Sequence, residues 1–168
     1  YDRTEAGVDP LGPENALLFM TGPVSGLIPG EPRYAAITKS PLTGTFLDSY
    51  SGGEFAAHLA GSLNDAMGLI VTGRAPEPVS LVVSDGDVSI EPAAAWGEDV
   101  ESACDAYPDA RVACTGPAGE NEVVYATIAS DGGDHHAGRG GAGAVMGSKR
   151  LKAVVAADPP PDGLESPR

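Results

Sequence analysis

The chain of 168 residues has few aromatic residues and few positive charges, and each scarcity excludes a class of partner. Aromatic residues make up 5% of the chain, and 10 lysines and arginines face 24 aspartates and glutamates, which gives a formal net charge of -14. Such a surface repels nucleic acid and anionic membranes, so we expect neither as a partner. It is compatible with docking a basic protein, but it is more typical of a halophilic protein adapted to high salt.

The chain also lacks a long apolar run and a secretory signal. No apolar segment is long enough to span a bilayer, and no charged n-region precedes an apolar h-region. We therefore expect a cytoplasmic protein. The first residue is Tyr1 rather than Met, which is compatible with a fragment or a processed product.

Residues that commonly bind metals are scarce. Cys104 and Cys114 are the only cysteines, and two thiols alone cannot hold an iron–sulfur cluster or a structural zinc ion. Without a secretory signal, reduced and half-buried thiols are favoured over a disulfide. The side chains of adjacent His135 and His136 should diverge on an exposed loop. His58 has no acidic or cysteine partner at ligand spacing, so we expect it at the surface.

Strand-like runs outnumber helical ones and are separated by short turns. Alternating apolar residues on either side of Asp85-Gly86 predict a β-hairpin. Apolar residues at four-residue spacing predict a helix over 54–67 that ends at Gly68. The pattern favours an α+β fold, a single domain of mostly antiparallel β-sheets with a few short helices. Further strands are expected over 16–20, 33–39, 69–71, 111–114, 123–128 and 151–156, and a short helix over 100–107.

The most unusual segment is Asp131–Lys152, which reads DGGDHHAGRGGAGAVMGSKRLK. It contains a G-x-G-x-x-G pattern, but a loop precedes that pattern, and the candidate ribose-binding acid, Asp158, lies in a proline run. A dinucleotide-binding unit is therefore not expected. A glycine-rich loop that leads into a helix remains, with Arg139 as a bidentate donor, and this combination favours an anionic ligand such as a phosphate.

Three other segments share this character: Arg33–Gly44, Ser51–Glu54 and Gly116–Asn121. The pair Gly52-Gly53 opens a helix and is a second potential anion-facing N-terminus. No Ser-His-Asp order, G-x-S-x-G, H-E-x-x-H or P-loop is present in the sequence, so we identify no catalytic residue.

In this order, the segments resemble the N-terminal domain of the aldehyde ferredoxin oxidoreductase family. The resemblance covers Asp9 to Ala156 and implies a domain over 9–157, with 1–8 as a lead-in and 158–168 as a proline-rich tail or linker. The matching pieces are DPLGPEN (Asp9–Asn15), Gly22-Pro23, RYxxxTKSPLTG (Arg33–Gly44), SGG (Ser51–Gly53), GPAGEN (Gly116–Asn121) and AGRGGxGAVMGSKxLKA (Ala137–Ala153).

The resemblance implies that the domain forms the base for a tungsten (or molybdenum) bis-pterin cofactor. Family enzymes oxidise aldehydes to carboxylic acids and pass electrons through a [4Fe–4S] cluster to ferredoxin. By position, Arg33 would lie between pterin and cluster, and Gly52, Gly138 and Arg139 would contact the pterin or its phosphates. The implied partners are ferredoxin, a small aldehyde and downstream helical domains. Those domains carry the cluster ligands, so the isolated chain is expected to be inactive.

The chain departs from the family pattern at two places. Tyr50 stands where the family has an Asn that helps to hold a magnesium ion between the two pterin phosphates. His135-His136 stand where the family reads Arg-Ala, in a loop one residue longer. Magnesium contacts made through backbone carbonyls would survive both changes, whereas side-chain contacts to phosphate would not. Lys39 and Lys149 match their motifs, and structural roles fit them equally well.

Two alternatives stay open. The chain is compatible with a stand-alone module that binds an anionic ligand or a partner without catalysis, or with a remnant that has only structural integrity. The sequence does not choose between tungsten and molybdenum, and it does not name the aldehyde.

Overall fold

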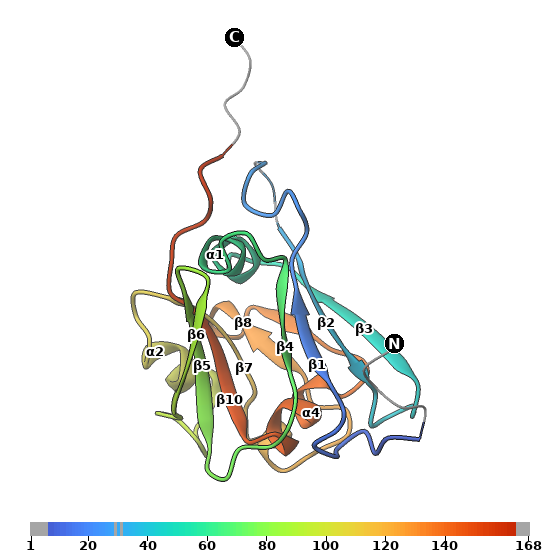
Figure 1. Cartoon of the computed structure of the whole chain (residues 1–168). Helices are drawn as coiled ribbons and strands as arrows, with labels where there is room; N and C mark the ends of the chain where they lie inside the picture. Colours follow the sequence, from blue (N-terminus) through green and yellow to red (C-terminus); the bar gives the residue numbers. More distant parts are fainter. Residues whose placement is uncertain (1–6, 29, 31, 164–168) are drawn as a thin grey trace.

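A computed structural model describes residues 7–28, 30 and 32–163, which form two β-sheets and several short helices (Figure 1). The smaller sheet has the order β3-β2-β1-β4 and is antiparallel throughout. The larger sheet has the order β6-β5-β10-β7-β8-β9, and only its β5–β10 pair is parallel. The strands are β1 (Leu17–Met20), β2 (Tyr34–Lys39), β3 (Phe46–Ser51), β4 (Gly68–Val71), β5 (Val79–Ser84), β6 (Asp87–Pro92), β7 (Arg111–Cys114), β8 (Ile128–Ser130), β9 (His135–Ala137) and β10 (Leu151–Ala156).

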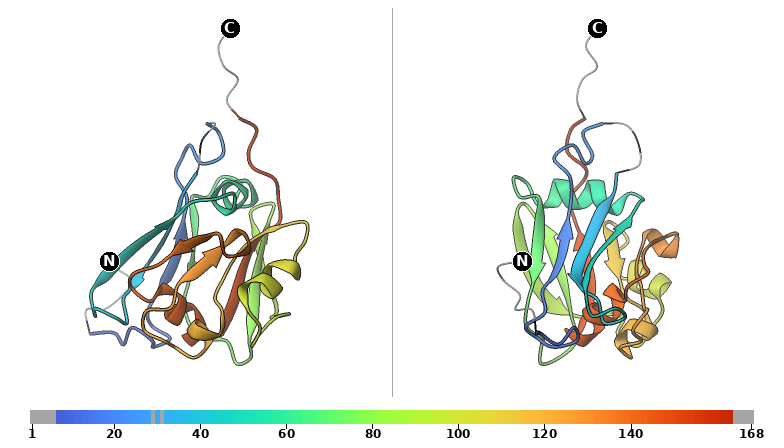
Figure 2. Two further views of the ribbon diagram at one scale, coloured as in Figure 1. Left: turned by 180° about the vertical axis from the view of Figure 1, so that it is seen from behind. Right: turned by 90° about the vertical axis from the view of Figure 1, so that its right-hand side faces the viewer.

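The main core lies between the two sheets, with helices at both ends. Helix α1 (Phe55–Ser62) lies across one end, where the C-terminal segment also leaves (Figure 2), and α4 (Ala142–Ser148) lies at the other end (Figure 1). Within this core, the Tyr34 ring stacks against Phe19 at 6.1 Å and meets Phe55 edge-on at 5.0 Å, measured between ring centroids. Burial of these large rings joins the smaller sheet to α1.

A second apolar cluster covers the opposite face of the larger sheet. Helix α2 (Val100–Asp105) packs there against β7 and β10, and the cluster contains Ala103, Val112 and Val155. All six residues of β10 are buried. Its five apolar residues are divided between the two clusters, whereas Lys152 is buried in an ion pair with Glu120. Burial on both faces explains why the apolar residues of β10 do not alternate with polar ones.

The expected α+β fold with mostly antiparallel sheets is confirmed. The hairpin is β5–β6, and its turn residues Asp85 and Gly86 have φ of 52° and 80°. The helix expected over 54–67 is shorter, since Leu63 is the C-cap of α1 and Asn64 has a left-handed φ of 57°.

The strand expected over 123–128 is wrong, because residues 123–126 form a turn closed by a hydrogen bond from Ala126 N to Val123 O of 2.8 Å. The sequence also missed β3, β9 and the short helix α3 (Pro117–Glu120). His135 and His136 lie in β9 rather than on an exposed loop, and His135 is half-buried. Among the described residues, no helix is long and apolar enough to cross a membrane.

The C-terminal segment packs on α1 as far as its residues are described. The Asp158 carboxylate accepts hydrogen bonds from Ser84 Oγ at 3.0 Å and from Asp85 N at 2.7 Å. His58, expected at the surface, is half-buried, and its Nδ1 lies 3.0 Å from the Asp158 carbonyl oxygen. Residues 164–168 of the expected tail lie outside the described residues, as do residues 1–6 of the lead-in.

Candidate functional site

Two edge strands from different sheets, β3 and β9, lie side by side (Figure 2). Ser49 of β3 donates its hydroxyl proton to the carbonyl of Gly138, at 2.8 Å, just after β9 ends. The glycine-rich loop is therefore held against β3 by a partly buried hydrogen bond.

A second hydroxyl fixes the same loop. Ser40, which is 1% exposed, donates to the Gly140 carbonyl at 2.7 Å. Its oxygen accepts from the backbone N–H groups of Leu42 and Thr43, at 3.2 and 3.1 Å. The motifs TKSPLTG and GRGG are thus parts of one structure, although they lie about a hundred residues apart in sequence.

The predicted site residues line this edge. Tyr34 pairs with Ser51 in the sheet, so Arg33, just before β2, and Gly52, just after β3, lie at the same end of these two strands. Gly138, and Arg139 after it, lie beside Ser49. From Ser49 to Gly52 the chain advances by roughly 10 Å at the usual rise of a strand. We call Arg33, Gly52, Gly138 and Arg139 the β3 strip.

The two arginines of the strip are exposed. Among the described residues, neither side chain has a hydrogen-bond or ion-pair partner. Arg139 also has a φ of 65°, a left-handed conformation that costs free energy for a residue with a side chain and often marks a functional site. Both guanidinium groups are therefore available to an anion.

The third motif, Ser51-Gly52-Gly53, is shaped by Asp131. A Cβ atom on Gly53, whose φ is +87°, would lie 1.9 Å from Asp131 Oδ2. That oxygen accepts a hydrogen bond from Glu54 N at 3.1 Å, at the start of α1. Burial raises the pKa of Asp131, while hydrogen bonds from the backbone N–H groups of Phe55 and Glu54 lower it. The N-terminus of α1 is therefore already occupied by a carboxylate of the chain, which corrects the expectation that it faces an external anion.

The N-terminus of α4 is not an open anion site either. Gly141, Ala142 and Gly143 are buried, and Gly143 N donates to Ala126 O at 3.0 Å. A Cβ on Gly143 would lie 2.2 Å from the Thr127 carbonyl oxygen, so this glycine permits close packing. Burial of these residues limits the access of a ligand to the N-terminus of α4, and Arg139 is the exposed residue beside it.

The lysines of the motifs have structural roles. Lys39 Nζ donates to Val8 O at 2.7 Å. Lys149 Nζ is bound by the carbonyls of Pro13 and Gly73, at 3.3 and 3.2 Å. Burial, together with the positive charge of Arg74, lowers the pKa of Lys149 to about 8.

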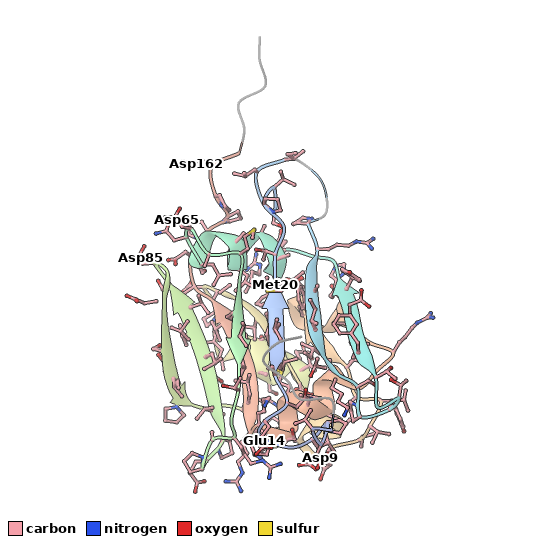
Figure 3. The ribbon with its side chains drawn as sticks, turned by 45° about the vertical axis from the view of Figure 1, so that its right-hand side comes forward. Asp9, Glu14, Met20, Asp65, Asp85 and Asp162 are labelled. Carbon is pink, nitrogen blue, oxygen red and sulfur yellow. The ribbon has the colours of Figure 1, made fainter. Side chains whose placement is uncertain are left out.

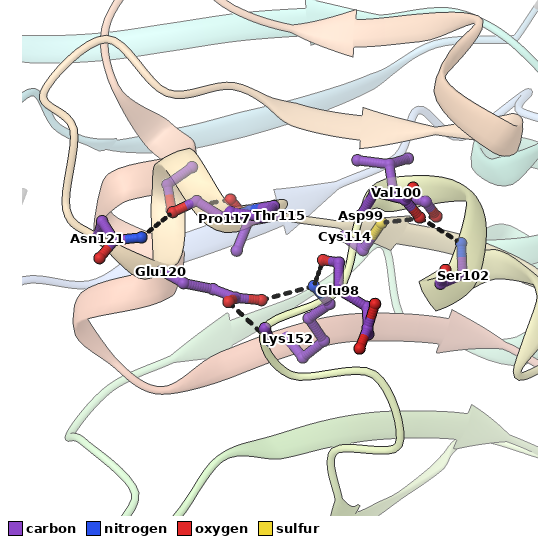
Figure 4. A network of polar contacts seen from close by, with 12 residues as sticks. Glu98, Asp99, Val100, Ser102, Cys114, Thr115, Pro117, Glu120, Asn121 and Lys152 are labelled. Atoms are coloured by element: carbon purple, nitrogen blue, oxygen red, sulfur yellow. Dashed lines mark hydrogen bonds and ion pairs between the residues drawn. The ribbon is translucent and has the colours of Figure 1, made fainter.

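A buried ion pair joins the last two motifs (Figure 4). Lys152 Nζ lies 2.5 Å from Glu120 Oε1, and the two side chains are 1% and 6% exposed. The same nitrogen donates to Glu98 O at 2.8 Å, and Glu120 Oε2 accepts from Gly97 N at 2.9 Å. The pair has the additional hydrogen bonds that a buried charge requires.

Tyr50, one of the departures from the family pattern, points outward from β3. It is 57% exposed, and its hydroxyl donates to Asp48 Oδ2 at 3.0 Å, which raises the pKa of Tyr50. Among the described residues, no group of three or more His, Cys, Asp or Glu side chains is arranged to hold a metal ion. The sequence analysis assigned no role to Ser40, Ser49 or Asp131, because their contacts with Gly140, Gly138 and Glu54 join residues that are far apart in the chain.

The fold and the strip together define a class of protein: a small α+β domain with two exposed arginines near β3 that have no partner in the part of the chain that the structure describes. The family described as aldehyde ferredoxin oxidoreductase, N-terminal domain, matches residues 1–158. The chain belongs to this family, and the resemblance inferred from its motifs is confirmed.

The chain is similar to parts of larger enzymes, whose names mention different substrates. The chain is 46% identical over 156 residues to a tungsten-containing aldehyde ferredoxin oxidoreductase of Pyrococcus abyssi, and this match covers 88% of the chain and 25% of that protein. It is 36% identical over 168 residues to the aliphatic sulfonate oxidoreductase, WOR-like subunit, of Pyrococcus furiosus, covering 89% of the chain and 26% of that protein.

A solved structure has the same fold. It is described as the active site complex BamBC of benzoyl coenzyme A reductase in complex with 1,5-dienoyl-CoA, and it matches with a TM-score of 0.87 and 36% identity. The match covers 96% of this chain and 25% of that chain. The chain thus spans about a quarter of the length of these relatives.

Proposed function

We propose that the chain is the cofactor-cradling domain of a tungsten (or molybdenum) bis-pterin aldehyde:ferredoxin oxidoreductase, and that the β3 strip binds the cofactor. The observation that carries this proposal is that Arg33 and Arg139 are exposed near β3, without a partner among residues 7–28, 30 and 32–163, in a chain with a net charge of -14. In so acidic a chain, most basic groups would be expected to pair with carboxylates.

The residues of the strip fit an anionic cofactor. A guanidinium group presents a planar fork of donors that matches two phosphate oxygens. Gly138 brings backbone close to the same edge, and its position is fixed by Ser49 before any ligand arrives. We propose that Arg139 and Gly138 hold pterin phosphate, and that Gly52 and Arg33 contact the pterin, with Arg33 on the side of the iron–sulfur cluster.

The relatives support a role that is independent of substrate. Their names mention an aldehyde oxidoreductase, an aliphatic sulfonate oxidoreductase and a benzoyl coenzyme A reductase. A domain shared by all three serves something that they have in common, and the word tungsten in the first name favours the metal cofactor. When bound, that cofactor would supply the two-electron oxidation of the aldehyde to the acid.

The parts outside the chain belong to the same proposal. The [4Fe–4S] ligands, the substrate channel and the ferredoxin surface would lie in the remaining three quarters of the parent enzyme. Magnesium between the pterin phosphates would be held by backbone carbonyls of this domain, because Tyr50 points away from the inner side of β3 and bonds to Asp48. No residue of this chain is assigned a proton transfer.

The test replaces the strip arginines in the parent enzyme. Arg139→Ala and Arg33→Ala should each weaken cofactor retention, since a charge-assisted hydrogen bond contributes about 1.5–3 kcal/mol, or roughly 10- to 100-fold in affinity. Tungsten and molybdenum content and pterin fluorescence are measured on each purified variant. Arg150→Ala is the matched control, because Arg150 donates to the Pro76 carbonyl and does not touch β3.

Loss of metal in both strip variants, with full metal in the control and unchanged circular dichroism, supports the proposal. An unchanged tungsten or molybdenum content in both strip variants would show that Arg33 and Arg139 do not bind the cofactor. The competing function, a stand-alone anion-binding module, is tested by sequencing the gene beyond the codon for Arg168, since a stop codon there would favour it and downstream cluster cysteines would oppose it.

A further inference from the structure

The two cysteines of the chain belong to one apolar cluster, on the face of the larger sheet that α2 covers. Cys104 is in the last turn of α2, Cys114 is the last residue of β7, and both belong to the apolar cluster under α2. The Cys114 sulfur lies 3.9 Å from the Val100 carbonyl oxygen (Figure 4). Val100 and Cys104 are four residues apart and so share one face of the helix, which is the face that meets Cys114.

The protonation of the pair is unequal. Interactions with the Cys114 side chain and with the backbone N–H of Gly132 lower the pKa of Cys104 to about 7, against partial burial. The interaction with Cys104, together with burial, raises the pKa of Cys114. The carboxylates of Asp105 and Asp131 oppose ionisation of Cys104.

Access to the pair is also unequal. Cys114 is fully buried, whereas Cys104 is half-buried and lines a groove of about 490 Å³. A reagent from solvent therefore reaches Cys104 and not Cys114. The charged and titratable groups that share the groove with Cys104 are Glu54, Asp105, Tyr107, Arg111, Asp131, Asp134 and His135.

We propose that Cys104 and Cys114 form a reversible modification site, a dithiol that small disulfides oxidise to an intramolecular disulfide. The Cys104 thiolate attacks one sulfur of the small disulfide, forms a mixed disulfide and releases one small thiolate. The Cys114 sulfur then attacks the Cys104 sulfur, and its proton passes to the second small thiolate, which is displaced from Cys104 and leaves as a thiol. Two electrons pass from the protein to the reagent, which is reduced to two thiols. This chemistry does not involve the proposed cofactor.

Peptide mapping tests the proposal, because Arg111 separates the two cysteines. The full chain is incubated with oxidised glutathione, alkylated and digested with trypsin, which yields residues 75–111 with Cys104 and residues 112–139 with Cys114. We expect these two peptides to be joined by a disulfide, with a mass about 2 Da below their sum because two hydrogens are lost. Treatment with a dithiol reductant should separate them.

Two single variants serve as matched controls. In Cys114→Ala, the mixed disulfide has no resolving partner, so Cys104 should keep a stable glutathione adduct. In Cys104→Ser, the buried Cys114 should stay unmodified while the fold, checked by circular dichroism, is retained. The wild-type chain should show little of the glutathione adduct, because Cys114 displaces the glutathione.

The pH dependence of alkylation tests the role of Cys114. The rate at which iodoacetamide modifies Cys104 should rise with an inflection near pH 7 in the wild-type chain, and the inflection should move to higher pH in Cys114→Ala, since the thiolate then loses its hydrogen-bond donor. A wild-type chain that accumulates the glutathione adduct without cross-linking, or that leaves both cysteines unmodified, would overturn the proposal.

Discussion

At the scale of single residues, most polar side chains of the family motifs bind the chain itself. Asn15 donates its amide to the carbonyls of Pro10 and Lys39, at 2.6 and 3.1 Å, and so joins the DPLGPEN loop to the end of β2. Arg33 and Arg139 are different because they have no partner among the described residues. A motif residue is therefore a candidate ligand only where the fold leaves its donors unused.

Removal of one charge of the buried pair should be costly. Glu120→Gln leaves Lys152 charged and buried without a carboxylate to neutralise it, which should lower the free energy of unfolding by about 3–5 kcal/mol. Glu91→Gln on the exposed strand β6 removes an equal charge and should change it by about 0.5 kcal/mol or less. Urea unfolding followed by circular dichroism measures both. A cost for Glu120→Gln below about 1 kcal/mol would show that the pair is not needed.

At the scale of elements, the sequence predicts those strands whose apolar pattern is set by burial. The hairpin β5–β6, together with β2, β7 and β10, is found where the pattern placed it. Strand β3 was missed because polar residues stand on both of its faces: Ser49 and Ser51 are buried, and Asp48 and Tyr50 are exposed. The sequence therefore supplied the residues of the strip, but not the strand that places them in one line.

The sequence predicted that the glycines of the motifs face a ligand, but several of them permit close packing of the chain instead. Gly147 illustrates this, because a Cβ on it would lie 1.9 Å from the Gly119 carbonyl oxygen. No local pattern distinguishes a glycine that admits a ligand from one that admits another segment of the chain. The distinction depends on contacts distant in sequence.

Gly53 allows a direct test of this packing role. Gly53 and Gly97 have nearly equal φ values, +87° and +89°, but only Gly53 has atoms of other residues within 4 Å of the Cβ position. Gly97→Ala should cost about 1–2 kcal/mol through its left-handed backbone. Gly53→Ala should cost roughly 1–3 kcal/mol more, because the new methyl group collides with Asp131. Equal losses in thermal unfolding would mean that the Asp131 contact is not tight.

At the scale of the whole molecule, the acidic surface is spread over the fold. Asp65, Asp85 and Asp162 lie at the end that carries α1, and Asp9 and Glu14 lie at the opposite end (Figure 3). Ion pairs such as Arg74–Glu122, Arg111–Glu54 and Lys152–Glu120 offset part of this charge, but the carboxylates outnumber the basic groups by 14. Repulsion between carboxylates therefore acts across the whole domain and is reduced by dissolved salt.

We expect the domain to lose structure as salt is lowered. At about 0.01 M salt the screening length is about 30 Å, and at about 1 M it is about 3 Å, so repulsion falls steeply over this range. The midpoint of thermal unfolding, followed by circular dichroism, should rise with potassium chloride. A midpoint and signal that stay constant from low to molar salt would contradict this reading of the composition.

The central claim is that the β3 strip cradles a metal–pterin cofactor, and crystals of the natively purified parent enzyme test it most directly. Anomalous diffraction measured on both sides of the tungsten edge, and then of the molybdenum edge, locates the metal without reference to any assumed site. We predict one strong peak facing β3, with pterin density that reaches Arg33 and phosphate density that reaches Arg139. A metal peak on another face of the domain, or fully ordered crystals with no such peak, would contradict the claim.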